Sequence, residues 1–117
     1  RLLIERFFVG RVVFSVRGGP IINDATLADA HETGITTVAE VIGNGSDAPG
    51  TLLEDCSEPF LKAFESADLI IAKGQGNYET LSHVAGRPIV FLLKAKCSVI
   101  SQNIGCRPGT SVIAYAD

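Results

Sequence analysis

Residues that could bind an anion or a metal ion are concentrated in four short segments, each of which follows an apolar stretch. They include Asp24, the glycine- and asparagine-rich residues 43–47, Lys73 ahead of a Gly-x-Gly, and Lys94. A carboxylate is the hard oxygen ligand that magnesium and manganese prefer, and lysine binds phosphate as a point charge. Glycine loops add backbone N–H donors. Together, these residue types fit a phosphate ester held beside a divalent cation.

Each segment also has a purely structural interpretation. Asp24 lies near a predicted helix start, where aspartate is a common N-cap residue. Residues 43–47 have the composition of a turn, and Lys94 could be a solvated surface charge. Lys73 is harder to explain in this way, because it directly ends an apolar stretch and precedes the glycines. Four such segments on one edge of a sheet would favour a binding site over four unrelated turns.

The apolar stretches alternate with helical patterns, which predicts a mostly parallel sheet covered on both faces. We therefore predict one α/β domain over residues 1–117, with a three-layer α/β/α, Rossmann-like architecture. Strand 68–72 is the clearest candidate for a buried strand. Ligands bind outside the carboxyl ends of strands in such sheets, so the four segments are expected at one edge. The expected elements are strands 11–16, 38–42, 68–72, 88–93 and 111–115, and helices 23–33, 57–66, 78–84 and 97–104.

Two places along the chain have the sequence pattern of a capping box, in which an N-cap side chain and the third helical residue exchange hydrogen bonds. Thr26 and Asp29 form the first pattern, and Gly34 marks the end of that helix. Thr51 and Glu54 form the second. A further helix is therefore expected to start at Thr51.

Composition argues against several classes of partner. The formal net charge of −3 gives no basic excess, so nucleic acid is not expected as a partner. No apolar run approaches the ~20 residues of a membrane helix, and the first residues do not resemble a signal peptide. The three cysteines lack CxxC spacing and are expected to be reduced, which favours a cytoplasmic protein.

The four segments resemble those of the damage-control phosphatases, a metal-dependent family long catalogued as a domain of unknown function. The matching stretches are residues 18–27, 44–51, 72–81 and 91–97, and the archaeal and bacterial branch is the most similar. The resemblance extends from about residue 2 to residue 113. It implies hydrolysis of phosphate monoesters of sugars or related small metabolites. It also implies a divalent metal cofactor, with manganese, nickel, cobalt and magnesium as candidates.

The resemblance also implies roles for individual residues. Asp24 matches a metal-binding aspartate of the family, and with Lys73 and Lys94 it forms the expected catalytic set. Both lysines are expected to bind the substrate phosphate. The other side chains expected to meet the substrate are Asn77, Ser46 and Asp47.

One family motif has no counterpart in this sequence. The family has an earlier aspartate–asparagine–alanine–glycine–glutamate loop that supplies two further metal ligands, on a strand that would precede Arg1. We therefore predict that the chain is the carboxy-terminal part of a longer phosphatase. Its expected partner is the amino-terminal part of the same protein. The isolated 117 residues are expected to bind metal weakly and to hydrolyse substrate slowly or not at all.

Other functional classes remain open at this point. The unmatched ligand loop favours a non-catalytic phosphate-ligand or interaction module as one alternative. A Rossmann-like methyltransferase is a second, although it would need an acidic residue for adenosine at a strand end. Dinucleotide binding is disfavoured, because Glu79 stands where the third glycine of a GxGxxG motif would follow Gly74 and Gly76.

Overall fold

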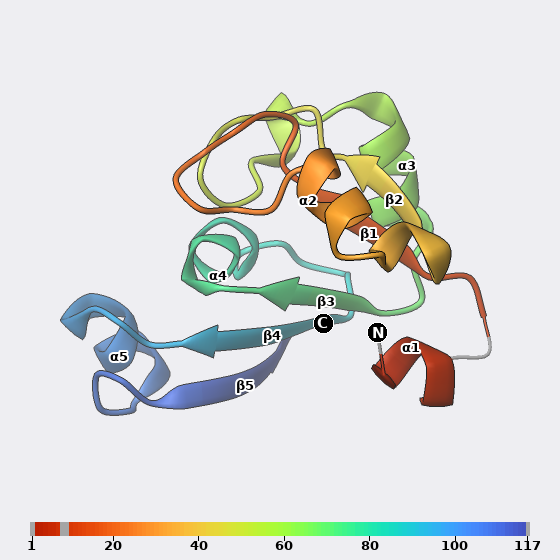
Figure 1. The fold of residues 1–117 in the computed structure, drawn as a ribbon. Helices are drawn as coiled ribbons and strands as arrows, with labels where there is room; N and C mark the ends of the chain where they lie inside the picture. Colours follow the sequence, from red (N-terminus) through yellow and green to blue (C-terminus); the bar gives the residue numbers. More distant parts are fainter. Residues whose placement is uncertain (1, 8–9, 117) are drawn as a thin grey trace. The chain divides into compact units, whose positions relative to one another are not determined.

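The structure is a computed structural model that describes residues 2–7 and 10–116 (Figure 1). The chain divides into two compact units. Unit 1 comprises the residues up to Ala48 together with Leu53–Phe64, and unit 2 comprises Pro49–Leu52 and the residues from Glu65 onward. Each unit contains its own β-sheet. None of the described helices has both the length and the apolar character needed to cross a bilayer.

The sheet of unit 1 consists of two parallel strands joined by a helical connection. Strands β1 (Val13–Val16) and β2 (Glu40–Gly43) pair in register from Val13 opposite Glu40 to Val16 opposite Gly43. The parallel pairing confirms the alternation of strand and helix that the sequence predicts. The helical elements of this unit are α1 (Leu2–Phe7), α2 (Leu27–Glu32), the 3₁₀ turns η1 (Ile35–Thr37) and η2 (Leu53–Asp55), and most of α3 (Glu58–Ser66).

Helix α2 begins at the first predicted capping box. The backbone N–H of Thr26 donates to the Asp29 carboxylate at 2.8 Å, and the Thr26 hydroxyl oxygen accepts from the Asp29 N–H at 3.4 Å. The helix therefore starts at Leu27 rather than near residue 23. After α2, Gly34 takes a φ of 73°, a left-handed conformation that glycine adopts without strain.

The second predicted capping box is wrong. Residues 53–55 form only the 3₁₀ turn η2, and the regular helix α3 begins at Glu58. The Thr51 hydroxyl donates to the Asn77 side chain, a contact that the local sequence pattern does not contain. A tertiary contact has therefore overridden a local helix signal. Helix α3 itself is confirmed and buries Phe60 and Phe64, one turn apart, on a single face.

The sheet of unit 2 has three strands in the order β3 (Ile70–Lys73), β4 (Ile89–Lys94) and β5 (Ser111–Ala116). Strands β3 and β4 are parallel, whereas β5 runs antiparallel to β4. The sheet is therefore mixed, and the described strands form two sheets. Two helices belong to this unit, α4 (Gln75–Leu81) and α5 (Ser98–Ile104).

The direction of β5 follows from the length of α5. A seven-residue helix is only ~10 Å long, whereas the six residues of β4 extend over ~20 Å. The chain is consequently still near the end of β4 when β5 starts, with Lys94 opposite Ser111. The N–H of Ala95 donates to the Thr110 carbonyl at 2.9 Å and extends this antiparallel pairing.

One face of the unit 2 sheet forms its core. Ile89, Phe91 and Leu93 alternate along β4 and are almost completely buried. The ring of Tyr78 in α4 packs edge-on against Phe91, with 5.2 Å between the ring centroids. Aromatic pairs favour this edge-to-face arrangement. Strand β4 is therefore the centre of the unit, and α4 lies against it.

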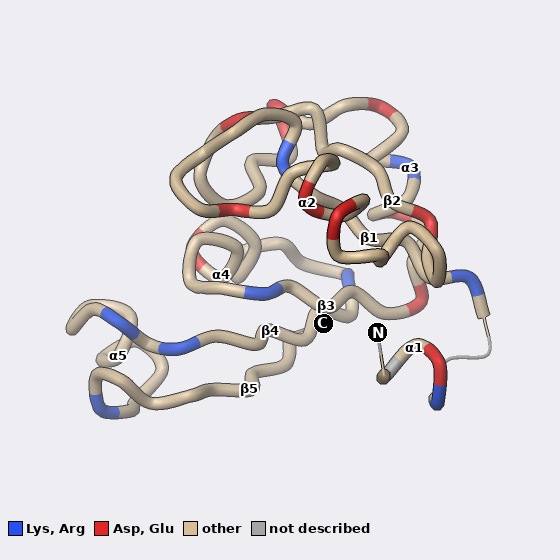
Figure 2. The backbone as a smooth tube through the Cα atoms, in the orientation of Figure 1, with Lys and Arg blue, Asp and Glu red and all other residues tan. Residues whose placement is uncertain are grey.

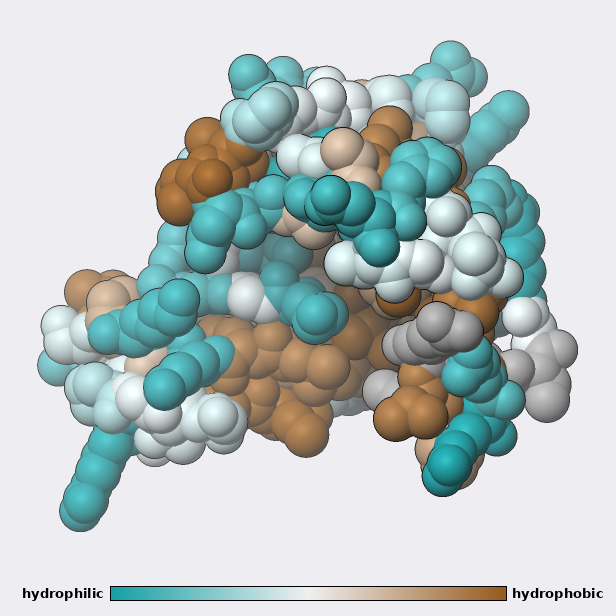
Figure 3. Space-filling model, in the orientation of Figure 1, coloured by the Kyte–Doolittle hydropathy of each residue, from teal (hydrophilic) through white to brown (hydrophobic). Residues whose placement is uncertain are grey.

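The opposite face of the same sheet is apolar and exposed among the described residues. Ile71, Val90 and Tyr115 form one cross-strand row, and Ile71 and Tyr115 are 45% and 62% exposed. Ile113 is 80% exposed on the same face. Figure 3 shows hydrophobic residues gathered over these strands. Residues 68–72 are the clearest candidate for a buried strand in the sequence, and this expectation is wrong. Ala72 is the only buried residue among these five.

Candidate functional site

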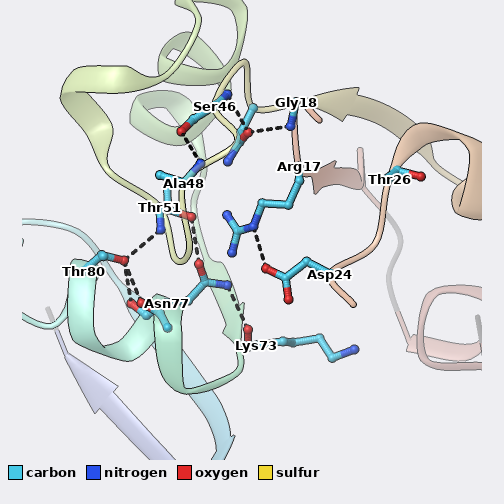
Figure 4. A network of polar contacts seen from close by, with 12 residues as sticks. Arg17, Gly18, Asp24, Thr26, Ser46, Ala48, Thr51, Lys73, Asn77 and Thr80 are labelled. Carbon is cyan, nitrogen blue, oxygen red and sulfur yellow. Dashed lines mark hydrogen bonds and ion pairs between the residues drawn. The ribbon is translucent and has the colours of Figure 1, made fainter. Parts of the chain in front are cut away.

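The loops that follow β1 and β2 are held together by one buried side chain. Asn44 is 1% exposed, and its Oδ1 accepts the N–H of Gly18 at 3.0 Å and the N–H of Ser46 at 2.9 Å (the dashed lines that end at Gly18 and Ser46 in Figure 4). A Cβ on Gly18 would lie 2.7 Å from the backbone of Gly45. Only glycine permits this approach. Since β1 and β2 are parallel, both loops leave the same edge of the unit 1 sheet.

Asp24 is held in an ion pair that the sequence did not reveal. The Arg17 Nε donates to Asp24 Oδ2 at 2.9 Å, with side-chain exposures of 11% for Arg17 and 42% for Asp24. Thr26 rather than Asp24 caps helix α2, so the helix-cap interpretation of Asp24 is wrong. The only sequence signal for Arg17 is its position. It is a basic residue directly after a strand, as Lys73 and Lys94 are basic residues at strand ends.

The two matched residues of the loop after β2 differ in their surroundings. Ser46 is 3% exposed, and its hydroxyl donates to Asp55 Oδ2 at 2.6 Å while accepting the Ala48 N–H at 3.1 Å. Asp47 is exposed, and its Cβ lies 3.6 Å from the position that a Cβ on Gly19 would take. Ser46 therefore organises its own loop, whereas Asp47 remains accessible to a ligand.

Lys73 and Lys94 lie at neighbouring strand ends in unit 2. Lys73 pairs with Leu92, and Lys94 follows Leu92 by two residues, so both lysine side chains project from the same face of the sheet. Both are exposed and make no hydrogen bond or ion pair with the described residues. Figure 2 shows these basic positions at the ends of β3 and β4. The structure thus confirms that these two lysines share one sheet edge.

Asn77 belongs to a helix rather than to a loop. Helix α4 begins at Gln75, directly after Gly74, and not at residue 78 as the sequence predicts. Gly74 takes a φ of 94°, which lets the chain turn into the helix immediately after β3. The Asn77 Nδ2 donates to the Lys73 carbonyl at 2.8 Å, and its Oδ1 accepts the Thr51 hydroxyl at 2.8 Å. Asn77 is therefore anchored to the residue that ends β3.

Gln75 links the segments that follow β3 and β4. Its Oε1 accepts the N–H of Lys96 at 3.0 Å, and its Nε2 donates to Glu79 at 2.9 Å and contacts the Cys97 sulfur at 3.5 Å. The Gly74 N–H donates to the Leu92 carbonyl at 2.8 Å. These bonds fix the backbone around both lysines. Gln75 was missed as a site residue because the sequence does not reveal its partners in the loop after β4.

The described residues do not form a complete metal centre by themselves. No group of three or more histidine, cysteine, aspartate or glutamate side chains that could hold a metal ion occurs within 2–7 and 10–116. Asp24 offers one hard oxygen ligand, and Arg17 would compete with a cation for its charge. His31 and His83 are exposed, as the sequence predicts, and all three cysteines are free.

The matched residues thus form two groups. In unit 1, Asp24 pairs with Arg17, and Ser46 and Asp47 lie on the loop that Asn44 ties to the loop after β1. In unit 2, Lys73, Asn77 and Lys94 surround the ends of β3 and β4. That all of them share one sheet edge stays a prediction.

Sequence comparison shows the family to which this chain belongs. The family model described as the damage-control phosphatase ARMT1-like domain matches residues 1–112. The chain therefore belongs to this family, and the resemblance deduced from its motifs is confirmed.

Individual relatives agree with this assignment. An uncharacterized protein of Methanocaldococcus jannaschii is 53% identical over 105 residues, and the damage-control phosphatase of Pyrococcus horikoshii is 44% identical over 101 residues. The alignments cover 87% and 86% of this chain, respectively. A damage-control phosphatase of Archaeoglobus fulgidus is 45% identical over 98 residues, which cover 83% of this chain. The chain spans only about a third of the length of these relatives, between 34% and 35%.

A solved structure resembles the fold closely. The crystal structure of a DUF89 family protein from Pyrococcus horikoshii matches 99% of this chain with a TM-score of 0.93 and 39% sequence identity. The match covers 42% of the crystallised chain.

Proposed function

We propose that the full-length gene product is a cytoplasmic, metal-dependent phosphatase that hydrolyses sugar phosphates or related small phosphorylated metabolites. Membership of the damage-control phosphatase family supports hydrolysis of a phosphate monoester. The observation that carries the proposal is the pair of exposed lysines on one face of the sheet, at the ends of β3 and β4. Residues 1–117 would then form one α/β domain of a longer, three-layer Rossmann-like protein.

Lys73 and Lys94 are the residues to which we assign the substrate phosphate. Two ammonium groups beside each other can stabilise the charge that spreads over the equatorial oxygens during phosphoryl transfer. Neither lysine side chain forms an ion pair with a described residue, so both remain available to an anion. Asn77 would line the same site, with its amide oriented by bonds to Lys73 and Thr51. In unit 1, we also assign the exposed Asp47 and Ser46, which shapes the same loop, to the substrate.

Asp24 is the residue to which we assign one metal ligand. A divalent ion bound there, whether manganese, nickel, cobalt or magnesium, would act as a Lewis acid toward a phosphoryl oxygen. The remaining ligands would come from polypeptide outside the described residues, because no group of three metal-binding side chains occurs among them. Arg17 would have to share or release Asp24 when the ion binds.

The partner of this chain would be the rest of its own polypeptide. The relatives are about three times as long as the matched segment. The exposed row of Ile71, Val90 and Tyr115 is an apolar sheet face of the kind that proteins cover. We therefore expect the isolated 117 residues to bind metal weakly and to hydrolyse substrate slowly or not at all.

A non-catalytic phosphate-binding module is the second candidate. It is favoured by the lack of a three-ligand metal group among the described residues and by the pairing of Asp24 with Arg17. Such a protein would keep the lysines for phosphate while lacking turnover. Sugar-phosphate binding without hydrolysis would distinguish it from the phosphatase.

The test is a phosphate-release assay on the full-length gene product with a panel of sugar phosphates, with and without manganese. We expect turnover that requires the metal and that is abolished by Asp24→Ala. Asp24→Ala with full metal-dependent turnover would refute the role of Asp24. Isothermal titration with the same sugar phosphates would detect binding by an inactive protein and so identify the second candidate.

A further inference from the structure

A four-residue segment from the loop after β2 is built into unit 2. Pro49–Leu52 belongs to unit 2, although the residues on either side of it belong to unit 1. Gly50 is buried with a φ of 75°, and a Cβ there would lie 2.4 Å from the Gly76 carbonyl oxygen in α4. The close approach of two backbones at Gly50 and Gly76 places the next residue, Thr51, directly against the helix.

Thr51 uses both its backbone and its side chain to hold α4. It is 7% exposed, and its N–H donates to Thr80 Oγ1 at 2.8 Å (Figure 4). The Thr80 hydroxyl in turn donates to the Gly76 carbonyl at 2.9 Å. The Thr51 hydroxyl donates to Asn77 Oδ1 at 2.8 Å. Both contacts lie within the first two turns of α4.

Asn77 connects Thr51 with the end of β3 through its two side-chain hydrogen bonds. With Oδ1 accepting from Thr51, the amide must point its Nδ2 toward the Lys73 carbonyl, to which it donates at 2.8 Å. Loss of the Thr51 hydroxyl would remove this donor to Oδ1 and leave the bond from Nδ2 to the Lys73 carbonyl without its support from the Thr51 side. The Lys73 peptide would then be held less firmly at the point where the lysine side chain leaves the strand.

We infer that Thr51 is a positioning residue for the phosphate site, which acts through Asn77 to fix the Lys73 peptide at the end of β3. This inference rests on the proposed function. Catalytic groups must be held close to their productive geometry, because small displacements lower the rate strongly. The local sequence predicts a regular helix that starts at Thr51, whereas the structure forms only the 3₁₀ turn η2 over residues 53–55.

The experiment compares Thr51→Val, Thr51→Ser, Asn77→Ala and the double variant Thr51→Val/Asn77→Ala in the full-length gene product. Valine keeps the shape of threonine without the hydroxyl, and serine keeps the hydroxyl. The probe is para-nitrophenyl phosphate with manganese, and KM and kcat are measured separately. A second readout is the Asn77 side-chain NH₂ signal in an ¹H–¹⁵N spectrum, identified by its absence in Asn77→Ala.

We expect Thr51→Val to lower kcat/KM roughly tenfold, through a higher KM, a lower kcat or both. This is the scale of one lost hydrogen bond. Thr51→Ser should stay within about twofold of the wild type, and the double variant should be no worse than Asn77→Ala, because interacting residues are not additive. The Asn77 NH₂ signal should shift in Thr51→Val and stay in place in Thr51→Ser.

Three results would overturn the inference. In the first, the losses of kcat/KM in the two single variants multiply in the double variant. In the second, Thr51→Ser and Thr51→Val lose kcat/KM equally. In the third, Thr51→Val leaves the Asn77 NH₂ signal unchanged. A wild-type protein without hydrolysis would refute the proposed function and with it the link to substrate. In that case the Asn77 signal would still show whether Thr51 orients Asn77, so the two failures are distinguishable.

Discussion

The two units place polar residues at the ends of parallel strands in opposite ways. In unit 1 the polar groups satisfy one another. Asp24 pairs with Arg17, Ser46 bonds to Asp55, and the buried Asn44 joins the two loops. In unit 2 the glutamine and asparagine of α4 fix the backbone, whereas Lys73 and Lys94 extend into solvent without a partner among the described residues.

This difference separates residues that shape a loop from residues that are available to a ligand. A side chain whose hydrogen bonds are already made within the protein must give them up before it can bind a substrate. An exposed ammonium group gives up only water. We therefore expect variants of the unit 1 network to lower stability first and variants of the unit 2 lysines to lower activity first.

The largest effect is expected for Lys73→Ala in the full-length gene product. Removal of one preorganised group that stabilises transition-state charge costs about 10²- to 10³-fold in kcat. The melting temperature should hardly change, because exposed substitutions alter stability by about 0.5 kcal/mol or less. Steady-state kinetics and thermal unfolding check both parts. Lys62→Ala, an exposed lysine in α3, is the matched control and should leave both unchanged.

The next effect tests the backbone contact that seats Thr51. Gly50 and Gly86 both have a φ of 75°, but a Cβ meets the Gly76 oxygen at 2.4 Å from Gly50 and finds open space from Gly86. Both alanine variants carry a left-handed strain of about 1 kcal/mol. Overpacking should add about 2 kcal/mol to Gly50→Ala alone. Urea unfolding measures the difference, and equal losses for the two variants would contradict the close contact.

The third effect tests the self-contained network of unit 1. Asn44→Ala removes a buried acceptor of the Ser46 N–H and one of the two acceptors of the Gly18 N–H, which also donates to the Ser46 carbonyl. Leaving a buried donor unsatisfied costs about 1–3 kcal/mol, so we expect a loss of about 2 kcal/mol in urea unfolding. Asn23→Ala, at an exposed asparagine, is the control. An Asn44→Ala protein as stable as Asn23→Ala would show that the two loops do not depend on this side chain.

Local chemistry accounts for the features that sequence predicted well. The Thr26–Asp29 capping box and the helix stop at Gly34 need only neighbouring residues, and both are found where expected. The position of the two lysines follows similarly. Each ends an apolar strand, and parallel pairing brings such ends together.

Tertiary contacts account for what the sequence did not predict. Thr51 has the local pattern of a helix cap, yet its partners lie 26 and 29 positions along the chain. The Arg17–Asp24 pair and the burial of Ser46 likewise depend on how loops fold back. The antiparallel direction of β5 was not predicted either, although it follows from the short helix α5, which the sequence does predict over residues 97–104.

The smallest effect concerns the capping box of α2 and depends on pH. The backbone N–H of Thr26, and next its hydroxyl, donate to Asp29 and hold the pKa of that carboxyl below its ordinary value. A lowered folded-state pKa means that the carboxylate stabilises the fold at pH values above the unfolded-state pKa. This stabilisation is lost as the pH falls through the folded-state pKa.

Asp29→Asn should therefore be slightly less stable than the wild type at neutral pH, and the difference should vanish in acid. Unfolding by urea at both pH values measures it. In an NMR titration, Thr26→Ala should move the pKa of Asp29 back toward its ordinary value, because both donors to the carboxylate are disturbed or lost. A stability difference that persists unchanged in acid would mean that the charge of Asp29 contributes nothing. The capping box would then act through shape alone, unlike the charged groups of unit 2.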